Sequence, residues 1–127
     1  MAVPPDLTEL QLAVLRLLWR KGEATVAEVQ AGLEDRELAI TTVATILQRL
    51  ERRGIVRHRS EGRQFVYRSL VDEPAVRHSM LGALVRSVFS GDPAAVVSQL
   101  LASDDVSAED LQRMHQLLEE SRTRKRR

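Results

Sequence analysis

Apolar residues recur with the period of an amphipathic helix in residues 41–53, near the middle of the chain. Four of them fall at positions i, i+3, i+4 and i+7, namely Val43, Ile46, Leu47 and Leu50. At roughly 100° per residue the polar positions project to the other side, and these are Thr41, Thr45, Gln48 and Arg52, with Thr42 and Arg49 on the flank. Gly54 follows, and glycine ends helices because it enters the left-handed conformation without a Cβ clash. The pattern predicts a helix with one apolar and one polar face.

Strand-like alternation follows this helix directly. Residues 55–60 and 63–69 have the pattern of two short strands, and the Glu61-Gly62 pair between them is a turn signal of hairpin length. One face of the hairpin must pack on the helices, and Val56 is the expected contact from the first strand. The second strand supplies either Phe65 and Tyr67 or, on the other face, Val66, because a one-residue slip in register exchanges the faces.

Two capping boxes mark helix starts before this region. In each, a threonine is followed three residues later by Gln or Glu, as in Thr8 with Gln11 and Thr25 with Glu28. The first box predicts a helix from residue 9 to 21 that ends at Gly22 and carries Trp19 as a core anchor. The second predicts a short helix to residue 32 or 33, followed by a polar turn over 34–39. Residues 23–24 can add a minor strand to the later hairpin.

The segment after residue 71 has a different pattern. Asp-Glu-Pro at 72–74 and Asp-Pro at 92–93 are helix starts, and Ser107 with Asp110 forms a third capping box. Each predicted helix has an apolar stripe, yet three short helices of about 50 residues make a thin core by themselves. The economical solution is packing against a second copy of the chain. The expected dimerisation residues are Met80, Leu84, Val88, Val97, Leu100, Leu101, Leu111, Met114 and Leu118.

The predicted fold class is therefore mainly α with a small β-hairpin. Helix, short helix, turn, helix and hairpin is the order of a winged helix-turn-helix. We expect a winged helix-turn-helix DNA-binding domain over residues 1–71 and a helical dimerisation domain over residues 72–120. The closing residues 121–127 hold five basic and no acidic side chains, and we expect a disordered basic tail there.

Composition limits the classes of function. The chain has 127 residues, of which 43% are hydrophobic and 29% charged, as in a soluble globular protein. It has no cysteine, which excludes disulfides and thiolate metal sites and fits the cytoplasm. No signal peptide, membrane-inserting segment, metal site or cofactor-binding motif is recognisable, and none of the motifs of hydrolases, metalloproteases or phosphate loops occurs. We expect a protein without catalytic activity, cofactor or metal.

The distribution of charge indicates a polyanionic partner. Net charge is only +1, but residues 41–70 hold seven Arg and two Glu, a net of +5, while both flanks of this segment are acidic. A helix with a polar outer face fits the major groove of double-stranded DNA, and a basic hairpin can lie on the neighbouring backbone. The expected DNA-binding residues are Thr41, Thr42, Thr45, Gln48, Arg49, Arg52, Arg57, Arg59 and Arg63. Only four aromatic residues occur, which argues against stacking-based recognition of single strands.

Two long stretches of the chain resemble the penicillinase-repressor family of bacterial transcriptional regulators, the BlaI/MecI/CopY group. The most specific parts are Trp19 at the end of the first helix, the TTVxTxLxRLxxxG pattern from Thr41 to Gly54, and Tyr67-x-x-Leu70 at the close of the hairpin. The resemblance implies a homodimeric repressor whose helix 41–53 enters an operator palindrome. It also implies DNA contacts at the positions of Thr42, Thr45 and Arg49.

The chain departs from the family's pattern in three places. Staphylococcal-type members carry basic residues where this chain has Thr41 and Ala44, and the copper-responsive branch uses cysteines that this chain lacks. The β-lactam-responsive branch is inactivated by proteolysis at an Asn-Phe bond, and the aligned pair here is Gln99-Leu100. The resemblance therefore suggests cleavage at this pair, with a membrane sensor protease as the partner that relieves repression.

Two alternatives remain open at this point. One is a ligand-sensing winged-helix regulator, in which His78, Met80, Met114 and His115 line a pocket for a small molecule. The other is a protein-interaction module whose winged helix binds no DNA. A steep negative salt dependence of duplex binding, together with preference for one palindrome, would distinguish the repressor from this second alternative.

Overall fold

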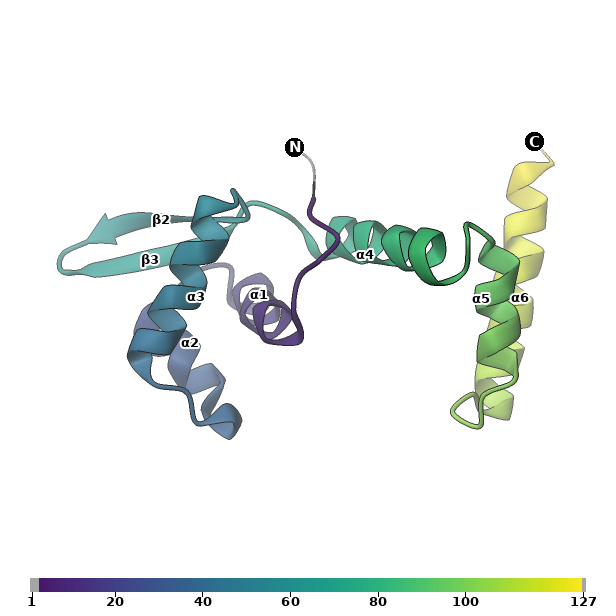
Figure 1. Ribbon diagram of the computed structural model, residues 1–127, viewed down its shortest axis with the longest axis horizontal. Helices are drawn as coiled ribbons and strands as arrows, with labels where there is room; N and C mark the ends of the chain where they lie inside the picture. Colours follow the sequence, from purple (N-terminus) through teal and green to yellow (C-terminus); the bar gives the residue numbers. More distant parts are fainter. Residues whose placement is uncertain (1–2, 127) are drawn as a thin grey trace. The chain divides into compact units, whose positions relative to one another are not determined.

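The computed structural model describes residues 3–126, and helices make up most of this part of the chain (Figure 1). A small antiparallel sheet has the strand order β1-β3-β2. The predicted class, mainly α with a small hairpin, is confirmed. In chain order the elements are α1 (Glu9–Lys21), β1 (Ala24–Thr25), α2 (Val26–Gly32), the 3₁₀ turn η1 (Glu34–Arg36), α3 (Ile40–Arg52), β2 (Val56–Glu61), β3 (Gln64–Ser69), α4 (Glu73–Val88), α5 (Pro93–Leu101) and α6 (Ala108–Lys125).

The capping boxes begin three helices where the sequence predicted them. At α1, the Thr8 hydroxyl accepts a hydrogen bond from the Gln11 backbone N–H across 3.1 Å, and the Gln11 side chain accepts the Thr8 N–H across 2.9 Å. The same reciprocal pair forms at the starts of α2 and α6. Each box satisfies two backbone N–H groups that have no partner inside the helix. Helix α1 then ends at Gly22, whose φ is 86°.

Helix α3 begins without a side-chain cap. The helix starts at Ile40, one residue before the predicted start, and its N-cap residue Ala39 offers no side-chain hydrogen bond. Its apolar face is the predicted one, because Val43, Leu47 and Leu50 are all fully buried. Gly54 follows with a φ of 76°, so the chain turns from α3 into β2 through the left-handed conformation.

The register of the hairpin resolves the alternative faces of β3. Val56 pairs with Ser69 and Glu61 with Gln64, so the turn lies at residues 62–63, one position later than predicted. Val56 and Tyr67 belong to the buried core. Phe65, one of the alternatives for this contact, is instead 46% exposed and stacks on the His58 ring. The minor strand predicted near residues 23–24 is present, since Ala24 pairs with Tyr67.

Trp19 is a core anchor, as predicted, and also a polar link. Its side chain packs at the edge of the core formed by α1, α2, α3 and the sheet. The indole Nε1 donates hydrogen bonds to the Val71 carbonyl oxygen at 2.8 Å and to the Ser69 hydroxyl at 3.2 Å. A buried tryptophan needs such a partner for its N–H group. This bond attaches the segment after β3 to the first helix.

The chain divides into two compact units between Ala83 and Leu84, inside α4. The sequence placed its boundary at residue 71. The first turns of α4 belong to the first unit because Val76 is buried in its core and Met80 packs against that core. The second unit contains the end of α4, α5 and α6, and α5 and α6 lie side by side (Figure 1).

Helix α6 continues through Lys125, which corrects the expectation of a disordered tail from residue 121. Arg and Lys are good helix formers, and cations are stabilised near the negative end of the helix dipole. Arg122 also lies 3.2 Å from Glu119, one turn earlier. Met1, Ala2 and Arg127 lie outside the described residues, so the predictions that include them are not assessed there.

Helix length and hydropathy also bear on membrane insertion. Among residues 3–126, no single helix is both long enough and apolar enough to cross a membrane. Helices α4 and α5 reach that length and composition only when taken together, across a break where the chain bends by 89°.

Candidate nucleic-acid interface

The outer face of α3 presents the polar side chains that the sequence singled out. All six of the predicted residues on this helix are exposed: Thr41, Thr42, Thr45, Gln48, Arg49 and Arg52. The Thr45 hydroxyl donates to the Thr41 carbonyl oxygen at 2.9 Å and can still accept a hydrogen bond from a partner. Within residues 3–126, Arg49 and Arg52 have no ion-pair partner. Two uncompensated guanidinium groups therefore stand beside hydroxyl and amide groups on one helix face.

The wing, residues 56–69, carries a second group of arginines on the sheet face that points away from the core. Arg57 lies directly opposite Arg68 in the register, and Arg59 is opposite Val66. These four side chains, with Glu23 and His58, line a hollow of about 460 Å³. Like charges opposite each other on a sheet repel, so the Arg57–Arg68 pair favours an anionic neighbour. Arg68 was not among the predicted DNA-binding residues.

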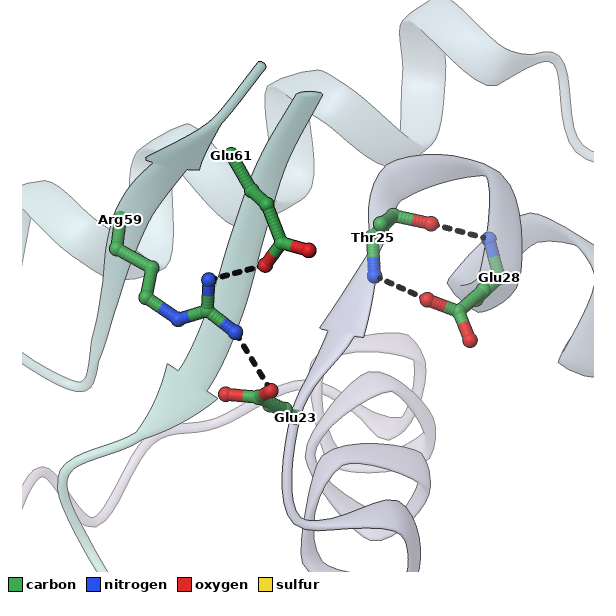
Figure 2. Close-up of polar contacts among 5 residues, drawn as sticks. All are labelled: Glu23, Thr25, Glu28, Arg59 and Glu61. Atoms are coloured by element: carbon green, nitrogen blue, oxygen red, sulfur yellow. Dashed lines mark hydrogen bonds and ion pairs between the residues drawn. The ribbon is translucent and has the colours of Figure 1, made fainter. Parts of the chain in front are cut away.

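Arg59 differs from the other predicted arginines because two carboxylates already hold it. Figure 2 shows its guanidinium group between Glu23, from the turn before β1, and Glu61, from the end of β2. The distance to Glu23 is 2.7 Å. The hydrogen bonds to Glu61 and then to Glu23 raise the pKa of Arg59 above its ordinary value. Its charge is offset within the protein, and it braces the wing against β1.

Arg53, the last arginine before the wing, is also engaged. Its guanidinium group lies 2.5 Å from the Asp6 carboxylate, at the N-terminal segment. The hydrogen bond from Arg53 is the largest cause that lowers the pKa of Asp6. Of the seven arginines in residues 41–70, five remain without an ion pair in the described part of the chain, namely Arg49, Arg52, Arg57, Arg63 and Arg68. The free positive charge is therefore divided between α3 and the wing.

The hairpin turn and the start of α3 border a common hollow of about 310 Å³. Arg63, from the turn, is exposed at its rim, and the exposed apolar side chains of Ile40 and Phe65 line it. Ile40 was not among the predicted interface residues, because the helix was predicted to begin one residue later. No local signal distinguishes it from the apolar stripe, since it lies three residues before Val43 and seven before Leu47.

His58 and Glu51 connect the end of α3 to the wing. The His58 Nδ1 atom lies 2.7 Å from Oε1 of Glu51, and the His58 backbone N–H donates to Oε2 at 3.3 Å. Tyr67, the cross-strand partner of His58, is buried, and its burial and then the Glu51 charge raise the pKa of Tyr67. His58 thus links β2 to the last turn of α3.

The second unit presents an apolar surface between two of its helices. Helices α5 and α6 line a hollow of about 480 Å³ whose walls are almost wholly apolar. It is formed by Val97, Leu100, Leu101, Leu111, Met114, His115, Leu117 and Leu118, six of which are on the predicted dimerisation list. Leu117 was missed, although it is 59% exposed and follows the same stripe. Leu84 and Val88 are exposed as well, whereas Met80 packs against the core of the first unit.

The residues of the ligand-sensing alternative border two different hollows or lie exposed. Met80 borders a hollow with Trp19 in the first unit, and Met114 and His115 border the one between α5 and α6. His78 is exposed on α4. The pair Gln99-Leu100 lies in the last turn of α5, and both residues are exposed.

Comparisons with known proteins agree with this geometry. The model of the penicillinase repressor family matches residues 7–120. The chain is 28% identical over 123 residues to the penicillinase repressor of Bacillus licheniformis, with 96% of each sequence covered. It is similar to the solution structure of the DNA-binding domain of the repressor BlaI, with 30% identity and a TM-score of 0.51 over 59% of this chain and 93% of that one.

A fourth comparison concerns the fold alone. A mutant of Escherichia coli MarR, solved in complex with operator DNA, has 15% identity and a TM-score of 0.53 over 91% of this chain and 76% of that one. Together with the exposed cationic surface, these likenesses define a winged-helix DNA-binding transcriptional repressor, a class without catalytic activity. The chain belongs to the penicillinase repressor family.

Proposed function

We propose that the protein represses transcription as a homodimer bound to a palindromic operator. The observation that carries the proposal is that no described side chain from residue 84 onward is buried. The second unit nevertheless exposes leucines and valines on every helix, and Val88 and Leu117 are 63% and 59% exposed. Apolar surface of this extent marks an interaction site in a soluble protein. A second copy of the same unit covers this apolar surface, and the dimer then carries two winged-helix DNA-binding surfaces.

In each chain, α3 and the wing contact different parts of the DNA. Threonine, glutamine and arginine on α3 suit base edges in the major groove, where Arg49 is the residue best able to contact guanine. Arg57, Arg63 and Arg68 suit the phosphate backbone, since none of them is held by a carboxylate within the described residues. Arg59 supports the wing more than it binds DNA. When the two half-sites of the operator lie about 10 base pairs apart, a dimer contacts both and binds more tightly than a single chain.

Selection of bound sequences from random duplexes tests this proposal, because it yields the half-site and its spacing together. We expect the selected sequences to form a palindrome. Sedimentation at protein concentrations that bind this palindrome should give the mass of two chains.

A matched pair of variants tests the interface: Leu117→Glu introduces a charge into the apolar hollow, and Gln116→Glu introduces the same charge at an exposed neighbouring position. The first variant should be monomeric and bind weakly, and the second should resemble the wild type. A single unrepeated site bound by a monomer would contradict the proposal.

For relief of repression, we propose cleavage at Gln99-Leu100 by a membrane sensor protease. The location of this bond in the last turn of α5 supports it, because helix ends open locally at low cost and a protease needs an extended strand. Cleavage here would separate α6 from the rest of the dimerisation unit. Mass spectrometry after incubation with the sensor protease tests the idea, and an intact chain in cells where repression has been lifted would contradict it.

A further inference from the structure

An acidic residue occupies the last turn of α3, where two physical effects oppose it. Glu51 is half-buried, with its side chain 30% exposed. A carboxylate near the C-terminus of a helix is disfavoured by the helix dipole. It also repels the phosphates of any DNA that lies along the helix. These costs require a local partner for the charge.

His58 is that partner, and it comes from the wing. Its ring Nδ1 lies 2.7 Å and 2.9 Å from the two carboxylate oxygens of Glu51, and its backbone N–H donates to one of them at 3.3 Å. Among residues 3–126, this is the one polar contact between side chains of α3 and of the β2–β3 hairpin. The carboxylate therefore binds both the backbone and the side chain of β2.

The link continues toward the tip of the wing through ring stacking. The His58 and Phe65 rings lie with their centroids 4.2 Å apart and their planes 28° from parallel. Phe65 is a diagonal neighbour of His58 across the hairpin, since His58 pairs with Tyr67. Two residues before Phe65 is Arg63, in the turn. Beyond β1, which pairs with β3 at residues 66 and 67, the wing is two-stranded. Such a hairpin has little stability of its own, so this chain of contacts supports the part of the wing that carries the free arginine.

We propose that Glu51 and His58 are positioning residues for DNA binding: they hold the wing at the angle to α3 at which Arg63 reaches the phosphate backbone while α3 is in the groove. The proposal rests on the function proposed above. Neither residue contacts DNA in this mechanism. Their effect is preorganisation, because a wing that is already oriented loses less conformational freedom when the complex forms.

The experiment measures duplex binding at several salt concentrations with the selected operator. We expect His58→Ala to weaken binding roughly three- to tenfold and to make the salt slope shallower by about one, as Arg63→Gln does, because one phosphate contact is lost. In the His58→Ala background, Arg63→Gln should have no further effect on the slope. His58→Asn should restore binding in part, since its amide N–H₂ occupies the place of Nδ1. Asp6→Asn is the control, because it removes another ion pair of the same helix end without touching the wing.

The outcomes distinguish a failure of the positioning role from a failure of the proposed repressor function. If His58→Ala leaves the salt slope and the effect of Arg63→Gln unchanged, or if Asp6→Asn matches it, the positioning role is wrong while the repressor function stands. Should His58→Ala fail to fold, Glu51→Gln keeps the shape of the side chain and must show the same loss of coupling to Arg63. A wild-type protein that prefers no duplex overturns both proposals.

Discussion

The indole Nε1 of Trp19 donates a hydrogen bond to the backbone carbonyl oxygen of Val71 across 2.8 Å, joining residues 52 positions apart. The same carbonyl also accepts from the Ser69 hydroxyl at 2.6 Å. The bond attaches the chain segment between β3 and α4 to α1. The start of α4 is therefore held against α1 within the first unit.

Trp19→Phe should lower the free energy of unfolding by about 0.5–1.5 kcal/mol, because it removes one hydrogen bond and part of the indole contact area. The loss should fall near the lower limit, since Ser69 still satisfies the Val71 carbonyl. Urea denaturation measures this. The double variant with Ser69→Ala should lose more than the two single losses added, because it leaves that carbonyl without either partner. Simple additivity would show that the two donors act independently.

Arg49→Ala should weaken operator binding by about 1–3 kcal/mol if this side chain contacts guanine, and the loss should disappear when that base pair is exchanged. A contact to phosphate would instead weaken binding to all sequences equally and make the salt slope shallower by about one. Fluorescence anisotropy with the operator and single-base variants distinguishes these results. Binding unchanged with every duplex would remove α3 as the groove-reading helix.

Glu61→Gln should strengthen DNA binding, roughly two- to fivefold at low salt, and make its salt dependence steeper. The substitution removes a negative charge beside the wing turn and releases Arg59 from one of its two carboxylates. Glu34→Gln, an exposed position in η1, is a control of equal charge change. If both variants gain the same affinity, the effect is one of net charge and not of the Arg59 pair.

The capping box of α2 should make stability depend on pH in the acidic range. Hydrogen bonding from the Thr25 backbone N–H, and then from its side chain, lowers the pKa of Glu28 below the ordinary value of 4.5. A carboxylate with a lowered pKa in the folded state stabilises the protein above its unfolded pKa, and this contribution is lost as pH falls through the folded value. The difference in Tm between wild type and Glu28→Ala should therefore be large at neutral pH and shrink below about pH 4.5.

Glu28→Gln is the control for that experiment, because it keeps an acceptor oxygen for Thr25 but carries no titratable charge. Its Tm should fall less than that of Glu28→Ala at neutral pH, and the gap to the wild type should close under acid. A difference between Glu28→Ala and wild type that stays constant down to pH 3 would contradict the assigned role of the charge.

Sequence alone determined most of the elements, because their signals are local. Capping boxes at Thr8, Thr25 and Ser107 each use residues three positions apart, and the apolar stripe of α3 spans only two turns, so no distant contact is needed to recognise them. The exposed residues of α3 follow from the same periodicity. The alternation of the wing predicted two strands, but it did not determine which face of β3 is buried.

Tertiary structure decided which of the expected arginines have a charge available for DNA. Arg57, Arg59 and Arg63 are equivalent in sequence, yet Arg59 is held by Glu23, which is 36 residues away, and the other two have no ion pair within residues 3–126. The exposure of Phe65 and the unburied surface of α5 and α6 likewise depend on how the elements pack. Local pattern specifies where helices and strands form, whereas ion pairs and burial arise only once the chain has folded.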